Sequence, residues 1–220
     1  MNYINNDKKP ILLTDLDGVS IDWLKGFVNY MEHELGHKAE HLKPKHFSMI
    51  DIFPEIEKPY LHIKDYQHTD HYREVESYKG SYEAYKTLKE MGVSVIAVTS
   101  CGEEKKIQEN RLYNLEKNFP DIFDDIHLLD LGADKTQVLS KYDNSRFIDD
   151  QLGNVLSGVK TGHKSYLWDM SYNKEDELPE NAFRAENWNI IVDDYKKELG
   201  LITDLSEKPK NMSRRRRGMR

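Results

Sequence analysis

Four sets of polar side chains in the sequence could do chemistry together if the fold brought them to one place. They are Asp15 with Asp17, Thr99 with Ser100, Lys135, and Asp149 with Asp150. Their types suit phosphoryl transfer, because one carboxylate can attack phosphorus while a second carboxyl moves a proton. Hydroxyl and ammonium groups can hold phosphate oxygens, and a further carboxylate can bind magnesium. The four sets therefore contain every group that such a reaction needs.

The segments around these side chains are typical of buried strands that alternate with amphipathic helices. Continuous apolar runs predict strands at 11–13, 93–98, 126–131, 146–148 and 164–168. Helical spacing of apolar residues predicts helices at 21–35, 81–91, 103–119, from about 134, 151–159 and 188–199. This alternation indicates an α/β fold, a Rossmann-like parallel sheet with helices on both faces. Because ligands bind beyond the carboxyl ends of such strands, we expect the polar sets to converge there.

The segment 37–79 interrupts this regular pattern. It contains three prolines and many aromatic residues and histidines, and it has no clear period. Together with the helix before it, this segment is interpreted as a small, mainly helical cap inserted after the first strand. The expected organisation is a Rossmann-like core of residues 10–19 and 80–200, a cap of residues 20–79, and a disordered basic tail of residues 201–220.

Composition limits the classes of protein that fit. Hydrophobic residues make up 38% and charged residues 32%, and no run approaches the roughly 18 apolar residues of a membrane span. The polar start Met1–Lys9 lacks the order of a secretory signal, so we expect a cytoplasmic protein with no membrane partner. Cys101 is the only cysteine, which excludes an intramolecular disulfide.

The formal charge of −7 is unevenly distributed along the chain. Five of the 32 Lys and Arg residues are arginines in the last ten positions, and none of the 39 Asp and Glu residues is there. The acidic body argues against extended nucleic acid as a partner, because proteins that bind it neutralise phosphates with clustered Lys and Arg. A small phosphomonoester accompanied by a metal ion fits this charge better. The oligomeric state stays open, and a homodimer is one alternative.

The four polar sets also carry a family resemblance. In order along the chain, the stretches are Asp15–Val19, Val95–Ser100, Lys135 and Phe147–Asp150. Together they resemble the four motifs of the haloacid dehalogenase superfamily of phosphatases, over most of 10–200 apart from the cap. The resemblance implies a hydrolase with an α/β core, a Mg2+ cofactor and a covalent aspartyl-phosphate intermediate.

Three stretches carry a narrower resemblance, to the 5′(3′)-deoxyribonucleotidases. They are Asp15–Trp23, Asp134–Thr136 and Phe183–Trp188. This resemblance implies a phosphatase that releases phosphate from nucleoside monophosphates. Two positions depart from the family pattern: Ser20 stands where a hydrophobic residue is common, and Gln151 stands where Arg is expected. The departures leave the substrate preference open.

The resemblance assigns the carboxylates to roles that their chemistry supports. Asp15 is the expected nucleophile, and Asp17 is expected to protonate the leaving oxygen and then to activate water. The expected Mg2+ ligands are the Asp15 carboxylate, the backbone carbonyl of Asp17, and Asp149. Asp150 could instead cap the helix that follows it, so Asp149 is preferred as the ligand.

The remaining site residues are expected to bind the substrate. Thr99, Ser100 and Lys135 would hold the phosphate oxygens, where negative charge lies in the transition state. Trp23 and Phe47 are the candidates for contact with the base, which stacking would bind with little selectivity. These two aromatic residues could also simply be core between the cap and the body.

Other functions remain open at the level of the sequence. The same mechanism could act on a sugar phosphate or on the 3′ phosphate of a polynucleotide. A non-catalytic protein that only binds a phosphorylated ligand is a further alternative. Loss of Asp17 or Lys135 would favour that alternative, and both residues are present.

Overall fold

A six-stranded parallel sheet forms the centre of the computed structural model, which describes residues 9–143 and 145–202. The strands are β1 (Ile11–Thr14), β2 (Ser94–Ser100), β3 (Asp125–Leu129), β4 (Arg146–Asp149), β5 (Lys164–Trp168) and β6 (Ala182–Ala185). Their order is β3-β2-β1-β4-β5-β6, so the chain crosses from one side of β1 to the other between β3 and β4. In sheets of this order the ligand crevice lies at that switch point, beyond the end of β1. The predicted α/β fold class is confirmed.

Helices cover both faces of the sheet. Successive residues of each strand point to opposite sides, and because the central strands β1, β2 and β4 carry buried apolar residues at successive positions, both faces must be buried. Leu12 and Ile148 lie in one buried cluster, and Leu13 and Phe147 lie in another. The first cluster contains side chains of α5 (Ser81–Glu90), α6 (Lys105–Asn118) and α9 (Trp188–Glu198). The opposite face is covered by α7 (Thr136–Leu139) and α8 (Leu152–Lys160).

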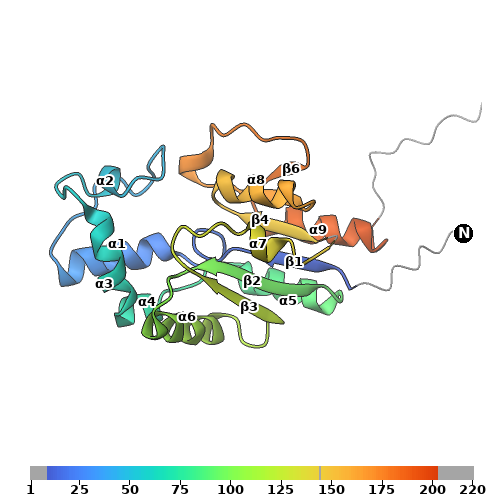
Figure 1. The fold of residues 1–220 in the computed structure, drawn as a ribbon, viewed down its shortest axis with the longest axis horizontal. Coiled ribbons are helices and arrows are strands. Elements are labelled where there is room, and N and C mark those ends of the chain that lie inside the picture. Colours follow the sequence, from blue (N-terminus) through green and yellow to red (C-terminus); the bar gives the residue numbers. More distant parts are fainter. Residues whose placement is uncertain (1–8, 144, 203–220) are drawn as a thin grey trace, which may run out of the picture.

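The segment 20–79, called the cap below, lies at the end of the sheet where the strands finish (Figure 1). Its elements are α1 (Trp23–Glu34), α2 (Met49–Ile52), the 3-10 helix η1 (Pro59–His62), α3 (Ile63–Gln67) and α4 (Asp70–Arg73). Buried aromatic rings hold these short elements together: Phe27 of α1 lies 5.4 Å from Tyr66 and 5.9 Å from Phe53 between ring centroids. These rings belong to the same continuous buried cluster as the side chains on one face of the sheet, so the cap packs onto the body.

Helix α6 fastens the last part of the cap to the body through amide side chains. Asn110 donates a hydrogen bond to the carbonyl oxygen of Gln67 at 3.0 Å. Asn114, one turn further along, donates to the carbonyl oxygens of Arg73 at 3.1 Å and Val75 at 2.7 Å. Residues four apart share one face of a helix, so these amides form a continuous polar stripe. The stripe holds the segment 67–75 on α6.

The predicted elements match the observed ones closely, with one strand missed. Strand β6 had no counterpart among the predictions, and the cap helices after α1 were not resolved individually from the sequence. The predicted basic tail 201–220 lies outside the described residues apart from Leu201 and Ile202. Among the described residues, no helix is long and apolar enough to cross a membrane.

Candidate active site

The turn after β1 places the first acidic pair at the switch point. The amide of Asp15 donates to the carbonyl oxygen of Ile148 at 2.8 Å, which fixes the start of the turn against β4. Gly18 then adopts a φ of +79°, a conformation that side chains disfavour. A Cβ atom there would lie 2.5 Å from Oδ2 of Asp150, so the position also lacks room for a side chain. The glycine therefore lets the first and last motifs meet.

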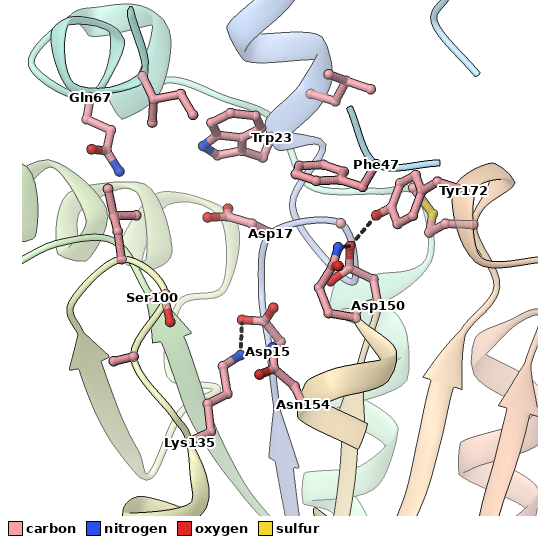
Figure 2. Close-up of a pocket in the computed structure, with 18 of the residues that line it drawn as sticks. Asp15, Asp17, Trp23, Phe47, Gln67, Ser100, Lys135, Asp150, Asn154 and Tyr172 are labelled. Atoms are coloured by element: carbon pink, nitrogen blue, oxygen red, sulfur yellow. Dashed lines mark hydrogen bonds and ion pairs between the residues drawn. The ribbon is translucent and has the colours of Figure 1, made fainter. Parts of the chain in front are cut away.

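Lys135 joins the first motif to the last. Its Nζ atom lies 2.9 Å from Oδ1 of Asp15 and 2.7 Å from Oδ2 of Asp149 (Figure 2 shows the contact with Asp15). The lysine is almost completely buried. Burial alone would lower the pKa of Lys135, but Asp149 and Asp15 raise it above its usual value, so the ammonium group stays charged.

Three carboxylates gather around this lysine. Asp15, Asp149 and Asp150 are buried, and each offers an oxygen that lies within 4.8 Å of the others. Burial raises the pKa of Asp149 to about 6, and burial and the neighbouring carboxylates raise that of Asp150 well above its usual range. A hard divalent cation would relieve this repulsion through the oxygen ligands it prefers. Asp150 is thus a further candidate ligand of the cation, beside the predicted ligands Asp15 and Asp149. The backbone carbonyl of Asp17 stays a predicted ligand.

Hydrogen bonds from neighbouring backbone and side-chain groups orient the carboxylates of the last motif, Asp149 and Asp150. Oδ1 of Asp149 accepts a hydrogen bond from the backbone amide of Gln151 at 2.8 Å and another from the side-chain amide of Asn154 at 3.1 Å. Asp149, rather than Asp150, thus accepts an amide hydrogen at the start of α8. The Asp150 carboxylate accepts instead from the hydroxyl of Tyr172 and from the Gln151 side chain at 3.1 Å. Such contacts fix carboxylates in the orientation that a metal site needs.

Asp17 does not join this cluster but contacts α6. Both of its carboxylate oxygens lie 2.6 Å from Nη2 of Arg111. The Asp17 side chain is 24% exposed, but it faces a pocket rather than open solvent. Burial therefore raises the pKa of Asp17 to about 6, against the lowering effect of Arg111. A carboxyl with this pKa can exist in both protonation states near neutral pH.

A pocket of about 370 Å3 opens between these groups and the cap. Its floor is polar and holds Asp15, Asp17, Ser100, Lys135, Asp150 and Asn154 (Figure 2). Its remaining wall is mainly apolar and holds Trp23, Leu24, Phe47, Ile63, Leu131, Met170 and Tyr172. Among the described residues that line it, Lys135 is the only Lys or Arg. The pocket therefore offers one cation and a largely apolar outer surface.

Most of the predicted substrate-binding residues line this pocket. Ser100 and Lys135 lie at the floor, and Trp23 and Phe47 both line the wall above it (Figure 2). Trp23 is nearly buried and stacks on a neighbouring ring of the cap, whereas Phe47 is 49% exposed. Thr99 is not among the lining residues; it is fully buried, and its hydroxyl has no hydrogen-bond partner among the described residues.

Two residues at the site, Arg111 and Tyr172, carry no motif in the sequence. Arg111 has a weak sequence signal, since it lies four residues after Ile107 and four before Leu115 on the apolar face of its helix. A charged residue at such a position indicates a buried partner. Tyr172 lies in a short 3-10 helix, η2 (Ser171–Asn173), with no regular pattern around it. No sequence signal identifies it.

Comparison with known proteins places this site in a family. No family model matches the chain. An uncharacterized 32.4 kDa protein of Enterobacteria phage T4 is 27% identical over 193 residues, 83% of this chain and 68% of that protein. A haloacid dehalogenase-like hydrolase from Streptococcus pneumoniae superposes with a TM-score of 0.60 and 17% identity, over 84% of this chain and 98% of that one. The pyrophosphatase PpaX of Halalkalibacterium halodurans is 30% identical over 183 residues, 70% of this chain and 83% of PpaX.

The chain belongs to the haloacid dehalogenase superfamily of hydrolases. This confirms, at the level of the superfamily, the prediction drawn from the four motifs. The narrower resemblance to deoxyribonucleotidases stays a prediction. For a haloacid dehalogenase hydrolase, the site supplies a carboxylate beside a buried ammonium group, a second carboxyl that can carry a proton, and oxygen ligands for a cation.

Proposed function

We propose that the protein is a Mg2+-dependent phosphatase that works through an aspartyl phosphate on Asp15. An oxygen of Asp15 attacks phosphorus, the bond to the leaving oxygen breaks, and that oxygen takes a proton from Asp17. Water then attacks the aspartyl phosphate and gives a proton back to Asp17, and the bond between phosphorus and Asp15 breaks. The contact of Asp15 with Lys135 supports this reaction, because the ammonium group also offsets charge on the transferred phosphoryl group.

The carboxylate cluster fits a magnesium ion in its chemistry. Asp15, Asp149 and Asp150 offer only oxygen atoms, which Mg2+ prefers, and the single Lys135 does not neutralise three carboxylates. When bound, Mg2+ would screen the repulsion between the nucleophile and the phosphate anion. Asp15 and Asp149, joined by Asp150, would hold it, together with the backbone carbonyl of Asp17.

A nucleoside monophosphate, as for a 5′(3′)-deoxyribonucleotidase, is the proposed substrate. The observation that carries this choice is the position of Trp23 and Phe47, on the pocket wall above Asp15 and Lys135 (Figure 2). A planar base could stack on such a surface while its phosphate lies at the floor. Ser100 and Lys135 are the proposed phosphate ligands, because both line the pocket and Thr99 does not.

The charge of the pocket supports a substrate with one phosphate. PpaX is named as a pyrophosphatase, which raises a pyrophosphate as a competing substrate. A second phosphate would need a second cationic partner, and Lys135 is the only Lys or Arg among the described residues that line the pocket. The polar side chains in the rest of the lining, Gln67, Tyr78, Gln151 and Tyr172, carry no positive charge to match a second phosphate. A monoester of an aromatic or otherwise apolar alcohol fits better.

A polynucleotide 3′ phosphate is a second candidate, favoured by one observation. A hollow of about 630 Å3 adjoins the pocket and shares Tyr78 and Tyr172 with it. Three lysines line this hollow, Lys25, Lys43 and Lys174, although acidic residues accompany them. Further phosphates of a longer substrate could lie there. A sugar phosphate is less well served, because the wall offers few polar partners.

Phosphate release from a panel of compounds tests these proposals. The panel contains deoxynucleoside 5′ and 3′ monophosphates, pyrophosphate, a sugar phosphate and a 3′-phosphorylated oligonucleotide, each with and without Mg2+. We expect the highest kcat/KM for nucleoside monophosphates, and a loss of at least about a thousandfold in kcat for Asp15→Asn. Preference for pyrophosphate or the oligonucleotide would reject the nucleotide assignment. No turnover of any compound would favour the protein that only binds a phosphorylated ligand.

A further inference from the structure

Arg111 is a fully buried cation whose contacts link the floor of the pocket to the cap. Its Nη2 atom lies 2.6 Å from each carboxylate oxygen of Asp17. Its Nε atom donates to the hydroxyl of Tyr72, in α4 of the cap, at 2.8 Å. The guanidinium carbon lies 4.6 Å from the centroid of the same tyrosine ring. Three hydrogen bonds, to two residues, and a ring contact thus fix the plane of the guanidinium group.

This arrangement is costly if its only purpose is stability. The Arg111 side chain is 0% exposed, and its Nη1 atom has no hydrogen-bond partner among the described residues. Burying a guanidinium group removes its hydration, and a buried ion pair is often no more stable than apolar residues of the same volume. The Asp17 end of the pair, by contrast, reaches the pocket. The geometry therefore favours a role in the reaction over a role in folding alone.

Arg111 acts on the reaction only through another residue. It is not among the residues that line the pocket, so it does not contact the substrate. The Asp17 carboxylate does line the pocket. In Figure 2 it points sideways and not toward the Asp15 carboxylate. An unpaired aspartate would be free to turn about its side-chain bonds. The contact of one nitrogen with both oxygens removes that freedom and leaves lone pairs of the oxygens open to the pocket.

We propose that Arg111 is a positioning residue for Asp17: it holds the carboxylate that transfers the proton in one fixed orientation at the pocket. This inference rests on the proposed phosphatase function. The positioned carboxylate receives the proton of the attacking water when the bond between phosphorus and Asp15 breaks. Through Tyr72, the same guanidinium group also contacts α4 of the cap.

A double-mutant comparison of kcat tests the proposal. Arg111→Met keeps much of the side-chain volume and removes the charge, and we expect a fall in kcat of about tenfold to a hundredfold with no rise in KM. In an Asp17→Asn background the same substitution should cost less than about twofold, because the carboxylate that it positions is gone. Losses that multiply in the double variant would overturn the proposal, as would an Arg111→Met enzyme with the original kcat.

Three further variants separate positioning from loss of structure. Arg111→Lys should recover part of the lost kcat, because it keeps the charge near Asp17. Tyr72→Phe removes only the hydroxyl that holds Arg111, and we expect a smaller fall in kcat than for Arg111→Met. In the Asp17→Asn background, Tyr72→Phe should cause no further fall. This second pair gives the same test if Arg111→Met does not fold. Asn118→Ala is the matched control on the same helix, since it removes a bond to the cap carbonyl of Val75 and leaves Asp17 alone; we expect the original kcat.

The outcome also separates this inference from the proposed function. If Asp17→Asn retains full activity, proton transfer by Asp17 is wrong, and the inference fails with it. If Asp17→Asn loses activity while the Arg111→Met loss is independent of it, only the positioning role fails. A kcat for Asn118→Ala as low as that of Arg111→Met would show that seating of the cap, and not Asp17, explains the loss.

Discussion

At the scale of single residues, the acidic groups of this site differ because their partners differ. Asp15 lies beside the buried ammonium group of Lys135, which pairs with the carboxylate that is proposed to attack phosphorus. Asp17 lies beside Arg111, yet burial raises its pKa to about 6, so it can exchange a proton near neutral pH. Two chemically identical side chains, two positions apart, thus have different environments, as the two proposed steps require. The local sequence provides the two carboxylates, and the cations that contact them in the fold give each a different environment.

Gly18→Ala is expected to damage both stability and activity. Alanine at a φ of +79° costs roughly 1 kcal/mol or more, and its Cβ atom would lie 2.5 Å from Oδ2 of Asp150. The control is Gly92→Ala, where φ is +86° and no atom lies within 4 Å of the added carbon. In urea unfolding, we expect Gly18→Ala to lose at least about 1 kcal/mol more than Gly92→Ala. Only Gly18→Ala should also lose kcat, and equal effects of the two changes would show that Gly18 matters for its backbone alone.

The motif residues of the site were predictable from the sequence, whereas their partners were not. Asp15, Lys135 and Asp149 follow strands or lie in a loop at the same sheet edge, so the parallel topology alone brings them together. Arg111 contacts Asp17 across 94 positions of the chain, and this pairing depends on how α6 packs against the cap. The period of the apolar residues predicts helix α6, but it gives no information about which residue Arg111 contacts.

At the scale of elements, the same distinction separates the sheet from the cap. Helices and strands of the core were predicted because their apolar residues recur with the period of a helix or form continuous runs. Strand β6 was missed because it has only four residues, Ala182–Ala185, lies at the edge of the sheet and exposes Phe183. The cap helices after α1 are four or five residues long, too short to show a period. Packing against α1 and α6 determines their structure instead.

The polar stripe of α6 should stabilise the cap in a measurable way. Asn114→Ala leaves the carbonyl oxygens of Arg73 and Val75 without their donor, which should cost about 2–4 kcal/mol in the free energy of unfolding. Asn118→Ala, at a half-buried position, should cost about 1 kcal/mol. Urea unfolding gives both values. Amide hydrogen exchange should also become faster in 70–77 for Asn114→Ala while the strands stay protected; uniform exchange across the chain would show that the stripe does not stabilise this segment specifically.

At the scale of the whole molecule, the buried carboxylates link folding to pH and to divalent cations. The folded-state pKa of Asp149 is raised to about 6, and that of Asp150 is also raised well above the unfolded value of about 4. Between these values the folded protein binds more protons than the unfolded chain, so these two groups lower the stability as pH rises. The contribution of Asp149 to stability is present below pH about 4 and is lost as the pH rises through about 6, and the contribution of Asp150 is lost as the pH rises through its own raised pKa. A cation that binds only the folded state opposes the loss.

The last prediction follows from this linkage. Mg2+ should raise the melting temperature more at pH 7.5 than at pH 5, because protons occupy the carboxylates at the lower pH. Asp150→Asn removes one buried charge, so without metal it should raise the melting temperature at pH 7.5 by about 4 °C, the shift that 1–2 kcal/mol gives in a protein of this size. Calorimetry of the two proteins at both pH values measures these changes. Other carboxylates, such as Asp124 with its pKa lowered to about 2, respond equally in both proteins and cancel in the comparison. If Asp150→Asn lowered the metal-free melting temperature at pH 7.5, the Asp150 charge would be stabilised by its partners without a cation, and the argument for metal at this cluster would fail.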